Sequence, residues 1–376
     1  MKIYYVANVR WPTSRAHGIQ LAKMSEALME EGVDLTLIVP NRGEGDPQTF
    51  YGLRQPIPVI RIPNLNLGNS ALGFNLSAFF FAVNSFLFLL FRRLEKDTIL
   101  YTIDLDNLSF FLLPFLGRPV FAEVHGSKKL SFFSKIFFSK ISGVFAVSEG
   151  VKSSLIKSFN LSLEKIIVCP NGIDFQMFEN LPAAETIRQK LNFPKGPVFL
   201  YVGRFYNWKG LEVLPAAAEK VGEKASIVLV GGSATEFSRI TGEKKLPANL
   251  IFAGIQPFSE IPLWLNAADF LLVTATKKDE YSYHETSPMK LFEYLATGKP
   301  IIAAKTPAIG NVVSAEEVIF YEPDDVADLI KQMNFVLDNQ NVCDAKAQRA
   351  LAKAKEFSWQ KRAERVLALM NKKIKK

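Results

Sequence analysis

The chain is poor in cysteine and lacks a segment typical of secretion. Its 376 residues include two cysteines, Cys169 and Cys343, far apart and outside any C-x-x-C pair. This spacing argues against a disulfide framework, a zinc ribbon or a thioredoxin-type centre and is typical of a reducing cytoplasm. The start, MKIYYVANVR, is a β-rich apolar run that ends at Arg10, without the long apolar region and cleavage site of a signal peptide. We therefore expect a cytoplasmic protein that begins with a core strand.

Two further sequence features are missing: an internal repeat of 20 to 50 residues, and a G-x-G-x-x-G fingerprint. After the first apolar run, Gly18 opens a helical pattern that stops at Gly32. A dinucleotide site is therefore not supported there. Gly18 is either a turn residue or, because it follows the first strand, a position where the backbone approaches a ligand.

What the chain does contain is enough apolar material for two cores and an excess of positive charge. Hydrophobic residues make up 48% of the sequence, and 45 Lys and Arg against 37 Asp and Glu give a net charge of +8. The charge favours an anionic partner, such as a nucleic acid, a phosphoester or an acidic membrane surface. Charge alone does not choose among them.

Short β-rich apolar runs alternate with helical patterns along the whole chain, in two successive series. This alternation predicts α/β architecture, with two doubly wound parallel sheets. We expect one domain over residues 1–175, a proline-rich linker over 176–196 and a second domain over 197–357. The amphipathic segment 358–376 reads as a terminal helix, which by itself could belong to the second domain.

Ligands of such sheets bind beyond the carboxyl ends of the strands. In the second series, the first strand ends at Gly203 and Arg204, and Lys209 follows five residues after the arginine, before a helix. Two cations at one helix start predict a diphosphate-binding arrangement, since arginine grips two oxygens and lysine supplies a point charge. The alternative is a solvated surface pair.

Two glutamates, Glu285 and Glu293, flank a predicted helix start at Ser287. The backbone N–H groups of Met289 and Lys290 would then point toward the site and suit a phosphate. A hydrolase with paired carboxylates is the rival interpretation. The positive surroundings favour glutamates that accept hydrogen bonds from the hydroxyls of a sugar or ribose.

His125 follows an apolar strand in the first series, within the segment PVFAEVHG. A histidine at a strand's carboxyl end can donate or accept a proton near pH 7. The alternative is a hydrogen-bonded structural histidine.

Six motifs in a fixed order resemble those of the retaining glycosyltransferases of the GT-B fold, specifically glycosyltransferase family 4. They are the Gly18 loop, EVHG, AVSEGVK, PNGID, GRFYNWKG and HETSPMKLFEYLATGKP. The resemblance implies two Rossmann-like domains that face a central cleft, with a nucleoside diphosphate sugar bound mostly by the second. It also implies that the C-terminal helix 358–376 crosses back to complete the first domain.

The resemblance assigns roles to particular residues. Arg204 and Lys209 would hold the donor diphosphate, Glu293 the ribose hydroxyls and Glu285 the donor sugar. Gly18 would let its loop approach the diphosphate, and His125 would lie near the reacting sugar. The loops around Gly232, Gly254, Ile255 and Gln256 would meet the base. The chain departs from many relatives after Glu285, where Thr286 to Lys290 replace a glycine-containing segment. Pro288 removes one possible N–H donor there, and Lys290 could supply another charge.

The expected reaction is transfer of a hexosyl group with retention, without a metal or other cofactor, to a glycan or lipid-linked acceptor. Such an enzyme would act in cell-envelope polysaccharide or glycolipid synthesis. Alternatives are a sugar-nucleotide epimerase and a catalytically silent scaffold that binds a partner or membrane. Asp104 and Asp106 form a D-x-D, which in the other major glycosyltransferase fold binds a metal; here they are interpreted as caps.

One long apolar run raises the question of a membrane. Residues 71–91 carry no charge in twenty-one positions, which by length alone is a candidate for a transmembrane helix. The alternative is a buried crossover helix, which the polar residues Asn75, Ser77, Asn84 and Ser85 suit. A span there would separate the Gly18 loop from His125. Residues 128–157 carry six lysines among phenylalanines, which predicts either a core helix with a solvated lysine face or peripheral binding to the anionic inner face of the plasma membrane.

Overall fold

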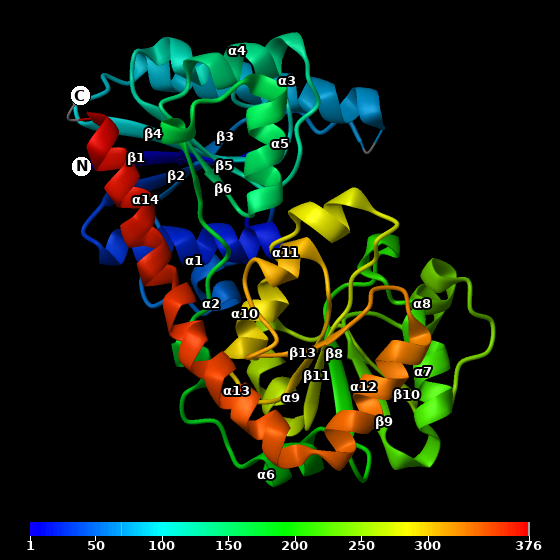
Figure 1. Ribbon diagram of the computed structural model, residues 1–376. Coiled ribbons are helices and arrows are strands. Elements are labelled where there is room, and N and C mark those ends of the chain that lie inside the picture. The colour runs from blue at the N-terminus through cyan, green and yellow to red at the C-terminus, as the bar shows by residue number, and fades with distance from the viewer. Residues whose placement is uncertain (69, 375–376) are drawn as a thin grey trace. The chain divides into compact units, whose positions relative to one another are not determined.

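The computed structural model describes residues 1–68 and 70–374, apart from the side chain of Asp104. They form two compact units, which Figure 1 shows as ribbons. Unit 1 comprises Met1–Gly172 and Trp359–Lys376, and unit 2 comprises Ile173–Ser358.

Unit 1 contains a seven-stranded parallel sheet in the order β3-β2-β1-β4-β5-β6-β7. From β1, the chain adds β2 and β3 on one side of the sheet and β4 to β7 on the other. The loops after β1 and β4 therefore flank the topological switch point, where such sheets bind ligands. The strands are β1 (Lys2–Val6), β2 (Asp34–Pro40), β3 (Val59–Ile62), β4 (Thr98–Asp104), β5 (Val120–Val124), β6 (Gly143–Ala146) and β7 (Ile166–Val168).

Helices cover both faces of this sheet: α1 and α14 lie on one, and α3, α4 and α5 on the other (Figure 1). The unit 1 helices are α1 (Ala16–Glu30), α2 (Pro47–Tyr51), α3 (Ala71–Phe91), α4 (Phe132–Lys140), α5 (Glu149–Phe159) and α14 (Trp359–Ile374), with short 3₁₀ turns η1 (Leu113–Leu116) and η2 (Leu163–Lys165). The last helix, α14, packs against α1 because Trp359, Ala363, Val366 and Met370 bury one stripe. This confirms that the terminal helix completes the first domain.

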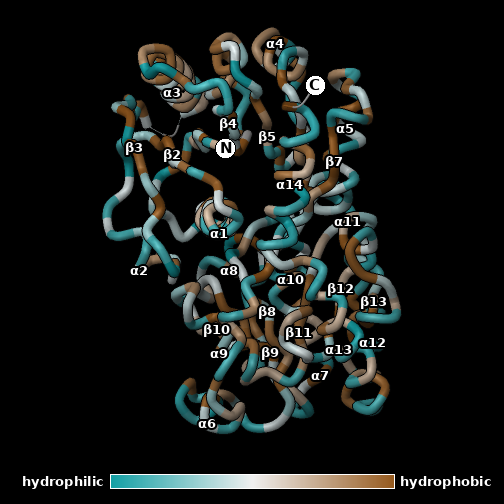
Figure 2. Tube along the Cα trace, turned by 90° about the vertical axis from the view of Figure 1, so that its left-hand side faces the viewer, coloured by the Kyte–Doolittle hydropathy of each residue, from teal (hydrophilic) through white to brown (hydrophobic). Residues whose placement is uncertain are grey.

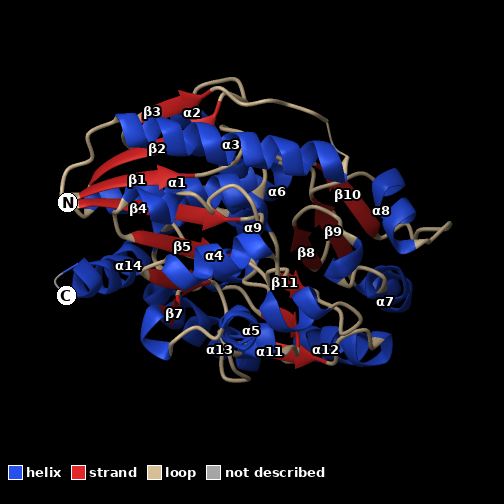
Figure 3. Cartoon of the chain, turned by 90° about the horizontal axis from the view of Figure 1, so that it is seen from above, coloured by secondary structure: helices blue, strands red, loops and turns tan. Residues whose placement is uncertain are grey.

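Helix α3 is neither a buried core helix nor detached from the fold. Seven of its 21 residues are buried, and Phe81 and Leu89 belong to the unit 1 core. By length and composition it is the one described helix that could cross a membrane. Figure 3 shows it running along the sheet, where it packs against β3 and η1.

Unit 2 contains a six-stranded parallel sheet in the order β10-β9-β8-β11-β12-β13, which again reverses beside its first strand. The two sheets therefore confirm the doubly wound architecture expected from the sequence. Its strands are β8 (Val198–Val202), β9 (Ser226–Val230), β10 (Leu250–Gly254), β11 (Phe270–Val273), β12 (Ile301–Ala304) and β13 (Ile319–Tyr321). Figure 2 shows the apolar character of these central strands.

The helices of unit 2 are α6 (Ala184–Lys190), α7 (Val213–Val221), α8 (Ala234–Thr241), α9 (Ile261–Ala267), α10 (Met289–Leu295), α11 (Pro307–Gly310), α12 (Val326–Asp338) and α13 (Gln340–Ala354). Residues 176–196, which we expected as a linker, are part of this unit and contain α6. Arg188 holds them there: its Nη1 lies 3.0 Å from Asp269 Oδ2, and its Nη2 donates to the carbonyls of Pro194 and Gly196. The chain passes between the units at residues 172–173 and 358–359 instead.

Candidate functional site

In unit 2 the predicted donor residues gather at the carboxyl ends of four neighbouring strands. The strand order places the loops after β10, β9, β8 and β11 side by side along one edge. Gly203 and Arg204 follow β8, Gly232 follows β9, and Gly254 ends β10. Sequence reasoning placed each residue after a strand, and the sheet order makes these loops neighbours.

Glycine is required where two of these loops cross. Gly203 has a φ of 140° and Gly231 a φ of 131°, in the region that only glycine adopts readily. A Cβ on Gly231 would overlap the carbonyl of Gly203. The N–H of Gly203 donates to Val230 O at 2.8 Å, and that of Gly231 donates to Gly254 O at 2.7 Å. These two backbone hydrogen bonds connect the loops that follow β8, β9 and β10.

Three basic residues, Arg204, Lys209 and Lys290, belong to these loops or to the start of α10. The Lys290 ammonium lies 3.4 Å from the centroid of the Tyr201 ring, beside Gly203, and has no hydrogen-bond acceptor among the described residues. Burial, together with the charge of nearby Lys209, holds the pKa of Lys290 well below its usual range. Lys209 lies 4.0 Å from the centroid of Trp208, and burial lowers the pKa of Lys209 to about 8. Arg204 is half-buried on the same loop as Lys209. A buried lysine without an acceptor among the described residues, beside a second lysine, favours an anionic ligand, which would stabilise its protonated form.

The two glutamates lie on different elements. Glu285 ends a π-helical turn, Tyr281–Glu285, and Glu293 lies in the second turn of α10. Burial raises the pKa of Glu293 to about 7, although the charge of Lys290 opposes this. A carboxyl group that is partly protonated at neutral pH can both accept from and donate to a hydroxyl.

The helix after Glu285 starts later than the predicted position at Ser287. Helix α10 begins at Met289, and Pro288, not Ser287, occupies the position before it, without a side-chain cap. The extended conformation of Thr286 and Pro288 delays the helix start. Met289 and Lys290 are therefore the first two residues of the helix, and the Lys290 side chain lies over the Tyr201 ring beside Gly203.

The residues predicted to meet the base differ in exposure. Gly232 is buried, and a Cβ there would lie 2.5 Å from the Phe205 ring, so its glycine is explained by packing. Ile255 is 55% exposed, next to Gly254 with its φ of 72°. The Gln256 amide donates to Ala253 O at 2.6 Å, which fixes the turn after β10. Ile255 is thus the apolar side chain of this loop that is open to a ligand.

In unit 1 the Gly18 loop is packed by its own side chains. The Gly18 N–H donates to Arg15 O at 2.9 Å, and a Cβ would lie 2.7 Å from the Tyr51 hydroxyl. Tyr51 accepts from the Thr13 N–H at 2.7 Å and donates to the Thr13 carbonyl at 3.0 Å. Gly18 is buried, so the structure explains this glycine by the close approach of Thr13 and Tyr51.

His125 is held by a buried carboxylate. Its Nε2 lies 2.8 Å from Oε1 of Glu123, which is fully buried in β5 and accepts from the Tyr101 hydroxyl at 2.7 Å. Arg362 of α14 grips the same carboxylate through two bonds, of 2.7 and 3.1 Å. Burial would raise the pKa of Glu123, but Arg362 and the hydrogen bond to His125 outweigh it and lower the pKa to about 2. His125 therefore contacts a carboxylate that is ionised at neutral pH.

Arg362 also connects Glu123 to neighbouring elements of unit 1. Its Nε donates to Pro170 O at 2.9 Å, at the start of the PNGID motif, and its Nη1 lies 3.0 Å from Met24 Sδ in α1. One side chain thus joins α14, α1, β5 and the end of β7. The opposing charge of Glu123 outweighs the effect of burial and raises the pKa of Arg362.

Sequence reasoning missed three residues of unit 1: Glu123, Arg362 and His17. The signal for the first two was a charged residue at an apolar position, within the strand PVFAEV and on the buried stripe of the last helix. His17 is half-buried beside Gly18. Burial, with the charges of Arg15 and His125, lowers the pKa of His17 to about 4, so it is neutral at pH 7. No pattern in the sequence singled it out.

Asp106 has a structural role. Its carboxylate accepts from the N–H groups of Leu108 and Ser109, both at 2.7 Å, and from the Ser109 hydroxyl at 2.6 Å. The other aspartate of the D-x-D, Asp104, has its side chain outside the described residues. Across the part of the chain that is described, no group of three or more His, Cys, Asp or Glu is placed to hold a metal ion.

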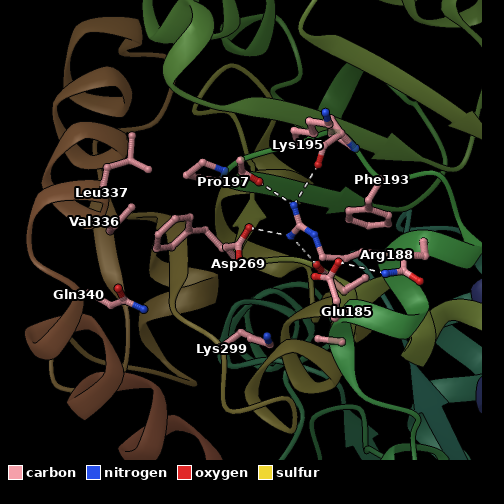
Figure 4. Close-up of a pocket in the computed structure, with 16 residues that line it drawn as sticks. Glu185, Arg188, Phe193, Lys195, Pro197, Asp269, Lys299, Val336, Leu337 and Gln340 are labelled. Atoms are coloured by element: carbon pink, nitrogen blue, oxygen red, sulfur yellow. Dashed lines mark hydrogen bonds and ion pairs between the residues drawn. The ribbon is translucent and has the colours of Figure 1, made fainter.

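A hollow of about 900 Å³ lies elsewhere in unit 2. Figure 4 shows its lining, which includes Glu185, Arg188, Asp269 and Lys299. These residues precede β8, β11 and β12, so the hollow lies at the amino ends of the strands, away from the cations of the donor loops. Since Arg188 bonds the surrounding chain, we interpret the hollow as a packing feature of the segment around α6.

Two family sequence models match the chain and together span most of it. Residues 18–176 match "Glycosyltransferase Family 4", and residues 183–357 match "Glycosyl transferases group 1". Sucrose-phosphate synthase from Thermosynechococcus elongatus has a similar fold, with a TM-score of 0.77 at 18% identity over 99% of this chain and 98% of that one. The chain belongs to glycosyltransferase family 4, a family of retaining enzymes with the GT-B fold.

Characterised relatives match over part of their length. An alpha-monoglucosyldiacylglycerol synthase of Streptococcus pneumoniae is 26% identical over 54% of this chain and 47% of that protein. A Campylobacter jejuni N,N'-diacetylbacillosaminyl-diphospho-undecaprenol alpha-1,3-N-acetylgalactosaminyltransferase is 24% identical over 64% of this chain and 60% of that protein. The match thus spans about half the length of these curated relatives. Anabaena HepE, solved with UDP-glucose, has a TM-score of 0.73 at 19% identity, over 99% of this chain and 100% of that one.

Proposed function

We propose that the protein transfers a hexosyl group from a nucleoside diphosphate sugar to an acceptor, with retention at the anomeric carbon. The observation that carries this proposal is the buried side-chain nitrogen of Lys290, which has no acceptor among the described residues and is close enough to Lys209 for their charges to interact. At the switch point of a doubly wound sheet, an anion of high charge would stabilise the protonated forms of these two neighbouring lysines, whose pKa values burial lowers. A diphosphate is such an anion.

The same cations would act on the departing group. As the bond between the anomeric carbon and the diphosphate oxygen breaks, negative charge develops on the diphosphate. Arg204, Lys209 and Lys290 would stabilise it, so the reaction would need no divalent ion. The acceptor oxygen attacks from the same face, and its proton passes to an oxygen of the leaving diphosphate. Glu293 would hold the ribose hydroxyls and Glu285 the donor sugar, while His125, fixed by Glu123, would contact the reacting sugar.

We further propose that the acceptor is lipid-linked and that the enzyme works at the cytoplasmic face of a membrane, in cell-envelope polysaccharide or glycolipid synthesis. One relative is named for a glycolipid product, alpha-monoglucosyldiacylglycerol, and another for a diphospho-undecaprenol derivative to which it transfers a sugar. The six lysines of residues 128–157 support binding to an anionic leaflet.

Binding of the donor group can be tested with nucleotides alone. Isothermal titration calorimetry with the diphosphates of uridine, guanosine and adenosine would identify the base, and UDP is the first choice because HepE was solved with UDP-glucose. The Lys290→Met variant should bind at least about tenfold more weakly, because it loses a charge-assisted bond. Lys299→Met is the matched control. Lys299 is another lysine of unit 2 that is at least partly buried, but it lies at the amino end of β12, away from Lys290.

Transfer itself requires labelled donor. Incubation with membranes or lipid extracts should label a glycolipid, and a sugar-nucleotide epimerase would instead convert the donor without acceptor. A silent scaffold would do neither. If no nucleoside diphosphate binds, or if Lys290→Met binds as tightly as the native protein, the donor site assigned here is wrong.

A further inference from the structure

The outer surface of α3 is apolar over most of its length. The helix contains no charged residue in 21 positions, and its mean hydropathy reaches 1.9. Figure 2 shows this apolar character along the helix. The large side chains exposed on it are Leu72, Phe74, Leu76, Phe79, Phe80, Leu87, Leu90 and Phe91.

The face that α3 turns toward the protein is the less apolar one. Two of its seven buried positions, Phe81 and Leu89, are large and apolar, and the other five are small or polar: Gly73, Ser77, Ala78, Ala82 and Ser85. Both hydroxyls are satisfied locally: Ser77 accepts from the Leu67 N–H at 3.3 Å, and Ser85 donates to Ala82 O at 3.2 Å. A helix on the surface of a water-soluble domain has the opposite arrangement, with large apolar residues inward. The arrangement of α3 suits an apolar medium outside.

The apolar surface continues onto α4 through a chain of aromatic rings. Phe79 of α3 stacks on Phe111 at 6.1 Å, Phe111 meets Phe133 of α4 at 4.8 Å, and Phe133 meets Phe132 at 5.7 Å. Phe132 is 73% exposed. We call the exposed apolar side chains of α3 together with Phe132 the α3 surface. A continuous apolar patch of this size marks an interaction site.

Positive charge borders the α3 surface. Arg92 and Arg93 follow α3 directly and are exposed, and Arg92 lies 5.6 Å from the centroid of Phe88. Lys135 and Lys140 of α4 are exposed as well. Between residues 107 and 148 the only acidic residue is Glu123, which is buried. A second copy of this chain would bring the same positive border against itself, whereas anionic lipid headgroups complement it.

We propose that the α3 surface inserts into the acyl boundary of an anionic bilayer while the basic residues around it contact the headgroups. The helix then lies in the plane of the interface, because crossing the membrane would pull Phe81 and Leu89 out of the unit 1 core. This inference extends the lysine-based contact of residues 128–157 to an inserted helix. It rests on the proposed function only for the benefit of reaching a lipid-linked acceptor.

Vesicle flotation tests the proposal without any transfer reaction. The full chain is mixed with phosphatidylcholine vesicles that do or do not contain phosphatidylglycerol, at low and high salt. The native protein should float with the anionic vesicles and retain part of its binding at high salt, because insertion of apolar side chains is not screened. The double variant Phe80→Asp with Phe91→Asp should lose binding on the order of a hundredfold, since each phenylalanine contributes about tenfold or more.

A matched control is available in unit 2. Phe335→Asp with Val342→Asp also replaces two exposed apolar residues, of 38% and 48% exposure, but outside the α3 surface, and should float like the native protein. Equal flotation of both double variants, or no flotation of the native protein, would overturn the proposal. So would a lipid-free dimer in analytical ultracentrifugation that only the α3 double variant converts to a monomer. Both double variants should bind nucleotide like the native protein, because none of the four residues belongs to the proposed donor site. Nucleotide titration thus separates failure of the membrane proposal from failure of the proposed donor site.

Discussion

Replacing Arg362 with methionine would leave the buried Glu123 carboxylate without its main counter-charge. The two side chains are 3% and 0% exposed, and the ion pair has two short contacts, of 2.7 and 3.1 Å. Removing one partner of a buried pair typically costs about 3–5 kcal/mol, because an uncompensated charge remains inside. We therefore expect the free energy of unfolding of unit 1 to fall by about 3–5 kcal/mol.

The loss of unfolding free energy in the Arg362→Met variant should depend on pH. In the native protein the pKa of Glu123 is lowered from 4.5 to about 2. This corresponds to about 3 kcal/mol at about 1.4 kcal/mol per pKa unit, a contribution present above pH 4.5 and lost as the pH falls toward 2. Without Arg362, burial would raise the pKa of Glu123 instead. The variant should then gain stability as the pH is lowered from about 8 to about 5, because the folded state binds a proton, whereas Glu123 gives the native protein no slope there.

Hydrogen exchange measured by mass spectrometry can follow unit 1 separately through peptides of β5, with urea denaturation of the whole chain beside it. The control is Arg349→Met, which breaks an exposed pair with Glu316 at 3.0 Å and should cost less than about 1 kcal/mol. Adding Glu123→Gln to Arg362→Met should recover part of the stability and remove the pH dependence. The reasoning is refuted if Arg362→Met costs no more than the control, or if its stability is constant between pH 8 and 5.

The remaining predictions concern the donor site. Because burial lowers the pKa of Lys209 to about 8, affinity for a nucleoside diphosphate should fall as the pH rises through that value; calorimetry showing constant affinity would contradict this. Gly203→Ala, at a φ of 140°, should cost about 1–3 kcal/mol and weaken nucleotide binding, while Gly222→Ala, away from the site, should leave binding unchanged. Glu293→Ala should raise the KM for the donor; native rates at both saturating and subsaturating donor would remove the role given to this residue. Transfer of labelled sugar should persist in excess chelator, and its loss with recovery on adding a divalent ion would show that the cations do not suffice.

The sequence specified the sheets and the position of the cations because its signals are local. Each strand is a short apolar run that needs no knowledge of distant residues, and two such series with helical patterns between them give two doubly wound sheets. Arg204 and Lys209 follow the first strand of the second series, so their place at its carboxyl end was readable from order alone. The terminal helix was ambiguous by its own pattern, and family resemblance assigned it to the first domain.

Tertiary structure decided which side chains meet and which are left uncovered. Arg362 and Glu123 are 239 residues apart, and no local pattern couples them. The sequence offered Lys290 as a helix-start N–H donor and as a further charge, but only the structure places its side-chain nitrogen over the Tyr201 ring. By its sequence the apolar segment 71–91 could have been buried or membrane-spanning, because hydropathy measures composition and not orientation. The packed helix shows that its small residues, together with Phe81 and Leu89, face the sheet, whereas most of its large apolar side chains are exposed.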